Sequence, residues 1–418
     1  MSQTVDDGAA DASLPKRRGP TRRFEARRSA IVRSAVEEMN RKGVRGMTLG
    51  DVAARLDLVP TAVIYYFRNK EELAAAAFLK GLEAYEALLA ASARQPEPAA
   101  RIAHFIDAYF DHVRRVASGE ADPFPVFNDV RALNREPVNL AYVEMFRGFR
   151  ALLPGPETLP RLHGNARAHM LLAQVLWIAA WRHQAEPADY PRLAQRMADI
   201  LNHGLVAEGR AWRAPPVLSL AAPSGPDATA SSEQFLRAAT QLINEEGYHG
   251  ASVERISARL NVSKGAFYHH NQTKDELVLA CFDRTFEIMW RAIRAAEARG
   301  GPALEVLSAA VTALAAHQIA GEAPLLRTSA LTTVPEPIRV GLLERFNRIS
   351  YRFASILCDG LADGSVRPVD VNVAAQIVTA AVNAASDLHH WTPGLTPETA
   401  ADHFVRPLFE GLVSPPAA

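Results

Sequence analysis

Apolar residues recur at intervals of three and four along most of the chain, a spacing that predicts amphipathic α-helices. One early series ends at Gly43, a residue suited to the end of a helix. Its apolar members are Ile31, Val32, Ala35, Val36 and Met39. No segment alternates apolar and polar residues cleanly enough to predict a strand, and proline-containing breaks separate the helical segments. We therefore expect an all-α protein.

Two short helices are predicted directly after this series. Thr48, with Asp51 three residues later, has the sequence of a helix start. Pro60 suits the first turn of the next helix, where its missing N–H group costs nothing. Val63 and Phe67, four residues apart, should face the interior. Helix, short turn and helix in this order are the arrangement that DNA-reading modules use.

The same module occurs a second time. A shift of 204 residues aligns the segment from Asn40 to Leu73 with the segment from Asn244 to Leu277 without a gap. Ten positions are identical, namely Asn40, Gly43, Gly46, Ala54, Arg55, Leu56, Ala62, Lys70, Glu72 and Leu73 with their counterparts. Shorter matches continue through both halves, including Ala173-Gln174-Val175 with Ala375-Gln376-Ile377 and Gly204-Leu205-Val206 with Gly411-Leu412-Val413. Because internal repetition decides architecture, we expect two similar units joined head to tail.

Length and composition agree with this organisation. The 418 residues are too many for one ordinary domain, and 48% hydrophobic with 22% charged residues is typical of soluble globular proteins. The longest apolar run, Met170 to Trp181, is shorter than the about 20 residues that cross a bilayer, and the N-terminus lacks the apolar core of a signal peptide. Cys281 and Cys358 match no metal or disulfide spacing. We expect a cytoplasmic protein with no membrane partner.

The charge is zero overall but unevenly placed. From Lys16 to Lys70 there are fourteen Lys and Arg against five Asp and Glu, a balance of +9. From Ser232 to Lys274 the count is five against four, a balance of +1. The first module therefore has the positive charge expected of a nucleic-acid binder, and the second barely has it.

The polar N-terminal segment allows two interpretations. It could be a disordered, solvated tail, or a basic arm that lies along phosphates or in a minor groove. We favour the arm because it adjoins a helix-turn-helix, and we assign DNA contacts within it to Arg22 and Arg23.

Of the two modules, the second has the closer resemblance to a known family. Val262-Ser263-Lys264-Gly265-Ala266-Phe267-Tyr268, followed by Thr273-Lys274-Asp275-Glu276-Leu277, is similar to the recognition helix of TetR/AcrR regulators and the start of the next helix. The family pattern is roughly V-S-K-G-T-L-Y-x-Y-F, two variable residues and K-E-x-L. Gly247 to Leu260 resembles the preceding helix. The resemblance implies two complete TetR-like units.

These units give the following expected boundaries. Residues 1–27 form a disordered basic arm, 28–74 the first helix-turn-helix domain and 75–212 the first helical regulatory domain. Residues 213–231, rich in Pro, Ala and Ser, form a linker. Residues 232–278 form the second helix-turn-helix domain and 279–414 the second regulatory domain.

The resemblance also implies which residues contact double-stranded DNA, since such motifs place the second helix in the major groove. In the first module the expected contacts are Thr48, Pro60, Thr61, Tyr65, Tyr66 and Lys70. In the second they are Ser252, Ser263, Lys264, Gly265, Tyr268, His269 and Lys274. The alternative for Tyr65, Tyr66 and Tyr268 is partial burial as packing residues.

Both modules depart from the family pattern. The first has Ile64 in place of the usual tyrosine and Val59 in place of a capping serine. The second has His270-Asn271 in place of Tyr-Phe, and an asparagine facing a small core destabilises unless it is hydrogen-bonded. One module could therefore be a degenerate reader.

The remaining helices of each unit resemble the family's ligand-binding and dimerisation domain, which implies a small-molecule effector. Aromatic and histidine residues that could bind it are His104, Phe105, Tyr109, Phe127, Phe286, Trp290, His317 and Phe346. The alternative is that this aromatic stripe is ordinary core. The family pairs two subunits through the last two helices, so the resemblance implies that the two halves pair within one chain, with Trp177 and Trp181 at the interface. A homodimer of fused chains is the alternative.

Other functional classes fit less well. The sequence has no Gly-x-Ser-x-Gly elbow, His-Glu-x-x-His motif, phosphate-binding loop or dinucleotide fingerprint. The pairs His269-His270 and His389-His390 point to different sides of a helix and make poor metal sites. We predict no enzyme activity, cofactor or metal. An interaction or scaffold protein with degenerate modules remains the rival interpretation.

Overall fold

The computed structural model describes residues 22–416, apart from 128–129, 131–132, 217, 221–226, 251, 260–272, 322–323, 328–329, 332–333 and 335. In the first unit the helices are α1 (Arg22–Gly46), α2 (Leu49–Ala54), α3 (Pro60–Ile64), α4 (Lys70–Ser92), α5 (Pro98–Ala117), α6 (Glu136–Ala151), α7 (Arg161–Trp181), η2 (Arg182–Gln184), η3 (Pro187–Asp189) and α8 (Tyr190–His203). In the second unit they are α9 (Asp227–Gly250), α10 (Val253–Arg259), α12 (Lys274–Arg299), α13 (Ala303–Ala320), α14 (Glu336–Ala362), α15 (Val371–Ala384), η5 (Ala385–Asp387), α16 (Leu388–Trp391), η6 (Ala401–Val405) and α17 (Arg406–Glu410).

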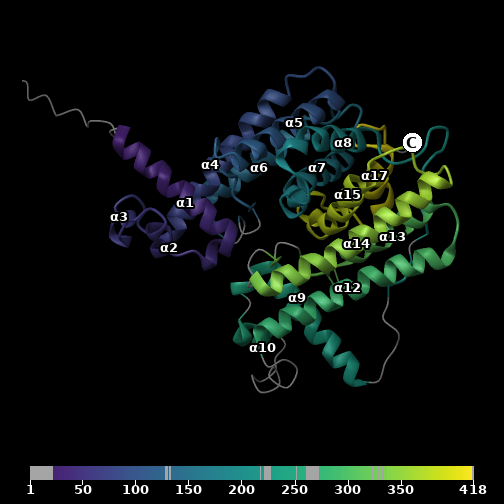
Figure 1. The fold of residues 1–418 in the computed structure, drawn as a ribbon. Helices are drawn as coiled ribbons and strands as arrows, with labels where there is room; N and C mark the ends of the chain where they lie inside the picture. Colours follow the sequence, from purple (N-terminus) through teal and green to yellow (C-terminus); the bar gives the residue numbers. More distant parts are fainter. Residues whose placement is uncertain are drawn as a thin grey trace, which may run out of the picture.

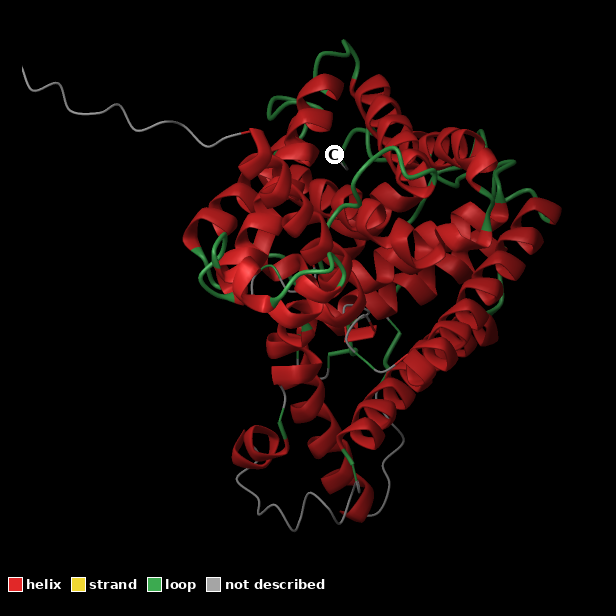
Figure 2. Cartoon of the chain, turned by 60° about the vertical axis from the view of Figure 1, so that its left-hand side comes forward, coloured by secondary structure: helices red, strands yellow, loops and turns green. Residues whose placement is uncertain are grey.

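The predicted all-α class is confirmed for the described residues, whose helices form two tandem units (Figures 1 and 2). The described residues contain no strand; they contain one isolated antiparallel bridge, between Val206 and Val366. The repetition in the sequence is therefore a repetition of helical units.

The first predicted boundary needs correction. α1 begins at Arg22, so the last part of the expected disordered arm, residues 22–27, is helical. Glu25 lies in the first turn, where a negative charge favours the helix dipole. Residues 1–21 lie outside the described residues. At the other end, Gly43 has φ 70°, and the helix is kinked there, where the sequence predicted its end.

The linker is also shorter than predicted. α9 begins at Asp227, inside the expected linker. The Nε1 of Trp212, at the start of this connection, donates a hydrogen bond to Ser308 Oγ at 2.8 Å. The carbonyl of Leu220 accepts one from Arg291 Nη1 at 3.0 Å. These described parts of the connection therefore lie against helices of the second unit, and a freely flexible coil does not describe them.

α13 is the central helix of the second unit. Its length and mean hydropathy of 1.4 would suit a membrane span, but 78% of it is buried inside the protein. It packs between α12 and α14. These properties identify α13 as a core helix.

The two units pack against each other through their last helices. α7 and α8 contact α15 and α17, which meet in the middle of the molecule (Figure 1). Gln174 Nε2 donates to the carbonyl of Ile377 at 2.9 Å, and Trp177 Nε1 donates to Gln376 Oε1 at 3.1 Å. Trp177 thus lies between the units as predicted. Trp181 does not fit that prediction as well, because its ring lies 6.3 Å from Phe110 in the core of its own unit.

Candidate DNA interface

The first module is held together by α1. Ser34 Oγ donates to the carbonyl of Val52 at 3.2 Å and joins α1 to α2. Val63 and Phe67 are buried beneath, as their spacing predicted. Burial of this pair leaves the opposite side of α3 facing solvent.

A capping box begins α2. Thr48 Oγ1 accepts from the backbone N–H of Asp51 at 3.0 Å, and the Asp51 carboxylate accepts from the backbone N–H of Thr48 at 3.3 Å. The predicted helix start is therefore confirmed. Lys42 Nζ lies 3.0 Å from Asp51 Oδ2, and this hydrogen bond, with that of Thr48, holds the pKa of Asp51 below its usual value. Thr48 is exposed, but a phosphate would compete with Asp51 for its N–H group.

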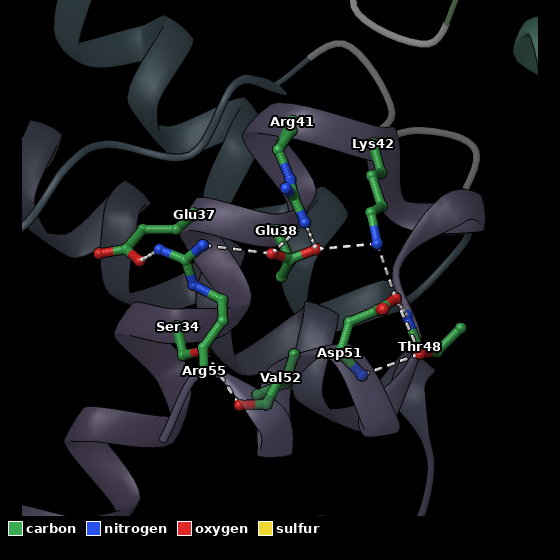
Figure 3. Close-up of polar contacts among 9 residues, drawn as sticks. All are labelled: Ser34, Glu37, Glu38, Arg41, Lys42, Thr48, Asp51, Val52 and Arg55. Atoms are coloured by element: carbon green, nitrogen blue, oxygen red, sulfur yellow. Dashed lines mark hydrogen bonds and ion pairs between the residues drawn. The ribbon is translucent and has the colours of Figure 1, made fainter. Parts of the chain in front are cut away.

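Glu38 is a buried carboxylate that the sequence analysis missed (Figure 3). Its Oε1 lies 2.8 Å from Arg41 Nη2 and 3.4 Å from Arg55 Nη1, and its Oε2 lies 3.3 Å from Lys42 Nζ. Burial alone would raise the pKa of Glu38, but the hydrogen bonds from Arg41 and Lys42 outweigh it and the pKa is lowered. The signal in the sequence was the position of Arg41 and Lys42, three and four residues after Glu38. This cluster ties the end of α1 to the end of α2.

α3 presents the predicted reading face to solvent. Pro60 occupies its first turn, as expected, and Pro60 and Thr61 are exposed. Tyr65, at the C-cap, is 75% exposed, whereas Tyr66 is half-buried. Val59 caps the helix without a side-chain hydrogen bond, in line with the absence of the family serine. A hydroxyl, a phenol and apolar groups are therefore available to base edges.

Phe24 supports this face and was not identified from the sequence. Its ring centroid lies 4.8 Å from that of Tyr66 and 6.2 Å from that of Tyr65. The Arg28 guanidinium lies 5.1 Å from the centroid of Phe67. The available signal was that Phe24 precedes Ile31 by seven residues, on the same face of a helix. The exposed Arg22 and Arg23 therefore begin a helix that packs beside the reading face.

The predicted lysine of the first module has a backbone partner. Lys70 begins α4, after the N-cap residue Asn69. Its Nζ donates to the carbonyl of Arg45 at 3.0 Å. An ammonium group has three donors, so this contact leaves capacity for a phosphate.

The second module is described only in part. Ser252 Oγ accepts from the backbone N–H of Arg255 at 3.3 Å, in the position of Thr48 in the first module. Thr273 and Glu276 form a capping box before Lys274. Burial lowers the pKa of Lys274; the charge of Asp275 opposes this effect, and the charge of Arg45 adds to it. The other expected contacts, Ser263, Lys264, Gly265, Tyr268 and His269, lie outside the described residues.

The two modules contact each other. α1 and α9 are in contact, and Arg45 at the end of α1 influences Lys274 at the start of α12. Of these two residues, Lys274 was predicted to contact DNA. Their proximity concentrates positive charge between the modules.

Most of the predicted effector residues of the first unit are packing residues. Phe105, Tyr109 and Phe127 are buried. The ring centroid of Tyr85 lies 5.9 Å from that of Tyr109 and 5.5 Å from that of Phe127. Burial raises the pKa of Tyr109. His104 is exposed and hydrogen-bonded through Nδ1 to Ser92 Oγ at 2.9 Å. The alternative interpretation as core therefore describes these aromatic residues better.

In the second unit two of the predicted residues line a cleft. Phe286 and Trp290 line an opening of about 510 Å³ beside Arg345. Phe346 is buried, with its ring 4.7 Å from Phe286, and His317 is half-buried in α13. Phe286 and Trp290 are accordingly the predicted effector residues that a molecule in this cleft could contact.

Comparison with known proteins agrees with the two modules. The family described as bacterial regulatory proteins, tetR family, matches residues 31–77 and 235–281. The TetC protein of transposon Tn10 from Escherichia coli is 40% identical over 50 residues, which are 12% of this chain and 25% of that protein. The matched stretch is thus about a quarter of that relative's length.

Three solved structures match this chain at lower sequence identity than the TetC protein does. The crystal structure of apo AibR shares 22% identity and covers 43% of this chain and 99% of that chain, with a TM-score of 0.37. The crystal structure of AibR in complex with isovaleryl coenzyme A and operator DNA shares 22% identity with this chain. The match covers 43% of this chain and 98% of that chain, with a TM-score of 0.36. The crystal structure of a transcriptional regulator of the TetR/AcrR family from Thermobifida fusca shares 20% identity with this chain. The match covers 43% of this chain and 96% of that chain, with a TM-score of 0.33.

The described residues therefore contain one capped helix-turn-helix, α2 and α3, and the corresponding first helix of a second module, α10. Two segments of the chain, 31–77 and 235–281, thus match the tetR family of bacterial regulatory proteins in tandem.

Proposed function

We propose that the chain is a cytoplasmic, ligand-responsive repressor that binds double-stranded operator DNA as a single-chain pseudo-dimer. The observation that carries this proposal is the packing of α7 and α8 on α15 and α17 within one chain. Those helices, which the family uses for pairing, are already covered by their internal counterparts. The reading face of α3 is left exposed at the same time.

The unlike modules define the expected operator. Thr61 and Tyr65 of the first module correspond by the 204-residue shift to Gly265 and His269 of the second. Different side chains at base-facing positions read different base edges. The operator should therefore be an imperfect palindrome, with unlike half-sites about one helical turn or a multiple of it apart.

The test combines a mobility-shift assay with a mass measurement. Genomic fragments containing the operator should be retarded at protein concentrations that leave unrelated fragments free. Analytical ultracentrifugation should give a mass near 45.5 kDa for the free protein. A mass near twice that value would support a dimer of fused chains, and absence of any specific shift would support the scaffold alternative.

Ligand response rests on differential binding. A small molecule can shift the balance between two arrangements only by its differential affinity for them. The cleft beside Phe286 and Trp290 offers aromatic and charged groups to such a molecule. A compound that releases the protein from operator DNA and stabilises it against heat would act as an inducer. Stabilisation without a change in operator affinity would argue against that role.

A further inference from the structure

A second and larger cleft lies at the joint between the two units. It has a volume of about 1040 Å³ and is lined by the start of α5, the end of α6, the α6–α7 connection and the start of α7. Val413, from the second unit, completes its wall. In Figure 1, α5, α8 and α17 lie on the side of the molecule away from α2 and α3. None of the residues expected to contact DNA lines the cleft.

The cleft is positively charged. Four arginines line it, Arg101, Arg147, Arg150 and Arg161, against the two acidic residues Glu97 and Glu157. Counting the lining side chains, 4 − 2 leaves a balance of +2. Arg147 also forms an ion pair with Glu144, which lies outside the lining, so the excess positive charge rests mainly on the other three arginines. Arginine is the residue best suited to bind carboxylate or phosphate in a planar, bidentate geometry.

Two of these arginines are held in place by backbone carbonyls. Arg150 donates through Nη1 to Pro154 at 2.7 Å and through Nη2 to Leu159 at 3.0 Å. Arg101 donates through Nε to Gln95 at 2.8 Å and through Nη2 to Pro96 at 2.9 Å. A carbonyl orients a guanidinium but does not neutralise its charge. The cleft therefore has oriented positive charge before any ligand binds.

The arginines belong to the first unit alone. A shift of 200 residues aligns Phe146 with Phe346 and places Asn347 and Ser350 opposite Arg147 and Arg150. Ser350 is buried and hydrogen-bonded to Thr379 Oγ1 at 2.9 Å. The helix thus packs in both units, but only the copy in the first unit has arginines at these two positions. This difference indicates that packing does not require Arg147 and Arg150.

We propose that this cleft binds a small organic anion that carries phosphate or carboxylate groups, with its charged end on the arginines and its apolar part against Leu153, Pro154 and Val413. Its volume of about 1040 Å³ lies just above the range for small-molecule sites, about 300–1,000 Å³. The N-termini of α5 and α7 open toward it and favour negative charge.

The ligand would also contact the joint between the units. Arg167 of α7 donates to the carbonyl of Leu412 at 2.9 Å and bonds the carbonyl of Ser414, on either side of Val413. Asn165, which lines the cleft, donates to the carbonyl of Trp391 at 2.9 Å. A bound anion would therefore stabilise the packing of the second unit on the first.

Isothermal titration calorimetry on the full chain without DNA tests the proposal. Inorganic pyrophosphate and citrate serve as probes at one fixed ionic strength, because salt screens such contacts. Saturable binding of pyrophosphate alone would identify a phosphate site, and that of citrate alone a carboxylate site. Absence of saturable binding by both probes would overturn the proposal. Operator binding is not involved, so this outcome is independent of the proposed repressor function.

Matched double variants locate the site. Arg147→Ala with Arg161→Ala removes two cleft arginines that are exposed, and affinity for the bound probe should fall about tenfold or more, since charge-assisted hydrogen bonds are lost. Arg192→Ala with Arg348→Ala removes the same charge from exposed positions outside the cleft and should leave affinity within about twofold. Equal loss in both variants would show non-specific attraction and overturn the assignment. Circular dichroism would confirm that both fold.

Discussion

The backbone N–H of Leu205 donates a hydrogen bond of 2.7 Å to the carbonyl of Phe409, which joins the end of the first unit to the end of the second. The N–H of Leu412 makes the corresponding bond to the carbonyl of Leu201, also at 2.7 Å. The glycine before each donor allows this approach. A Cβ added to Gly204 would lie 2.0 Å from the Phe409 oxygen. The two units are therefore in backbone contact, without room for a side chain.

Substitution of Gly204 should therefore destabilise the paired units. Gly204 has φ +69° and Gly209 has φ +76°, but a Cβ at Gly209 meets nothing within 4 Å. Both alanine variants are strained by a positive φ, at a cost of about 1–3 kcal/mol each. Gly204→Ala should lose about 1–3 kcal/mol more, because it also overpacks the joint. Urea denaturation of both variants measures the difference, and equal losses would contradict the role of this contact.

Stability should decrease in mild acid because of His163. Its ring lies 4.1 Å from that of His403 across the joint, and its buried Nδ1 has no hydrogen-bond partner among the described residues. Burial, followed by the charges of His403 and Arg167, lowers the pKa of His163 from 6.5. The unfolded chain therefore binds more protons than the folded one below about pH 6.5, so stability is lost as the pH falls through that value.

The variant His163→Gln removes this proton binding. The free energy of unfolding should then fall less steeply between pH 7 and pH 5.5 than in the parent chain (roughly the window below the ordinary histidine pKa). His403→Gln should have a smaller effect in the same direction, because it removes one of the two nearby charges. An unchanged pH dependence in His163→Gln would contradict the prediction.

The two modules should contribute unequally to DNA affinity. Thr61→Ala with Tyr65→Ala removes side chains that α3 exposes, and specific binding should be abolished, since good base contacts contribute about 1–3 kcal/mol each. Lys264→Ala with Tyr268→Ala should weaken binding only modestly, because the second module has a local balance of only +1. Fluorescence anisotropy with operator DNA measures both. The reverse order would make the second module the main reader.

The N-terminal basic segment should contribute to the salt dependence of binding. The logarithm of the affinity falls with the logarithm of salt concentration, with a slope near −0.9 for each phosphate neutralised. Deletion of residues 1–21 leaves α1 intact and removes Lys16, Arg17 and Arg18. The slope should become shallower if these residues lie on phosphates. A variant with the full original slope would show that this segment does not contact DNA.

Phe24 should act by positioning the reading face. Its ring packs on Tyr66, and Tyr66 adjoins the exposed Tyr65. Phe24→Ala should weaken operator binding without removing a charge, whereas Phe24→Tyr keeps the ring and should restore it. Salt slopes measured for both separate this effect from loss of phosphate contacts. Unchanged operator affinity in Phe24→Ala would show that the ring does not position α3.

The sequence alone determined the features that depend on neighbouring residues. The capping box of Thr48 and Asp51, the proline that begins α3 and the glycine that interrupts α1 involve residues at most four positions apart or single backbone preferences. Periodicity placed Val63 and Phe67 inside. Repetition indicated two units, because an unbroken alignment needs no knowledge of packing.

Tertiary structure decided which distant residues meet. The sequence treated Trp177 and Trp181 alike, but only Trp177 has a hydrogen-bond partner in the other unit among the described residues. In the first unit, the aromatic residues Phe105, Tyr109 and Phe127 are buried, since periodicity places a side chain inward without showing whether space remains beside it. The arginine cleft brings together two separate segments of the first unit, 97–101 and 147–165, and Val413 of the second unit. Such a site depends on how helices pack, and helix packing is determined by contacts between residues far apart in the chain.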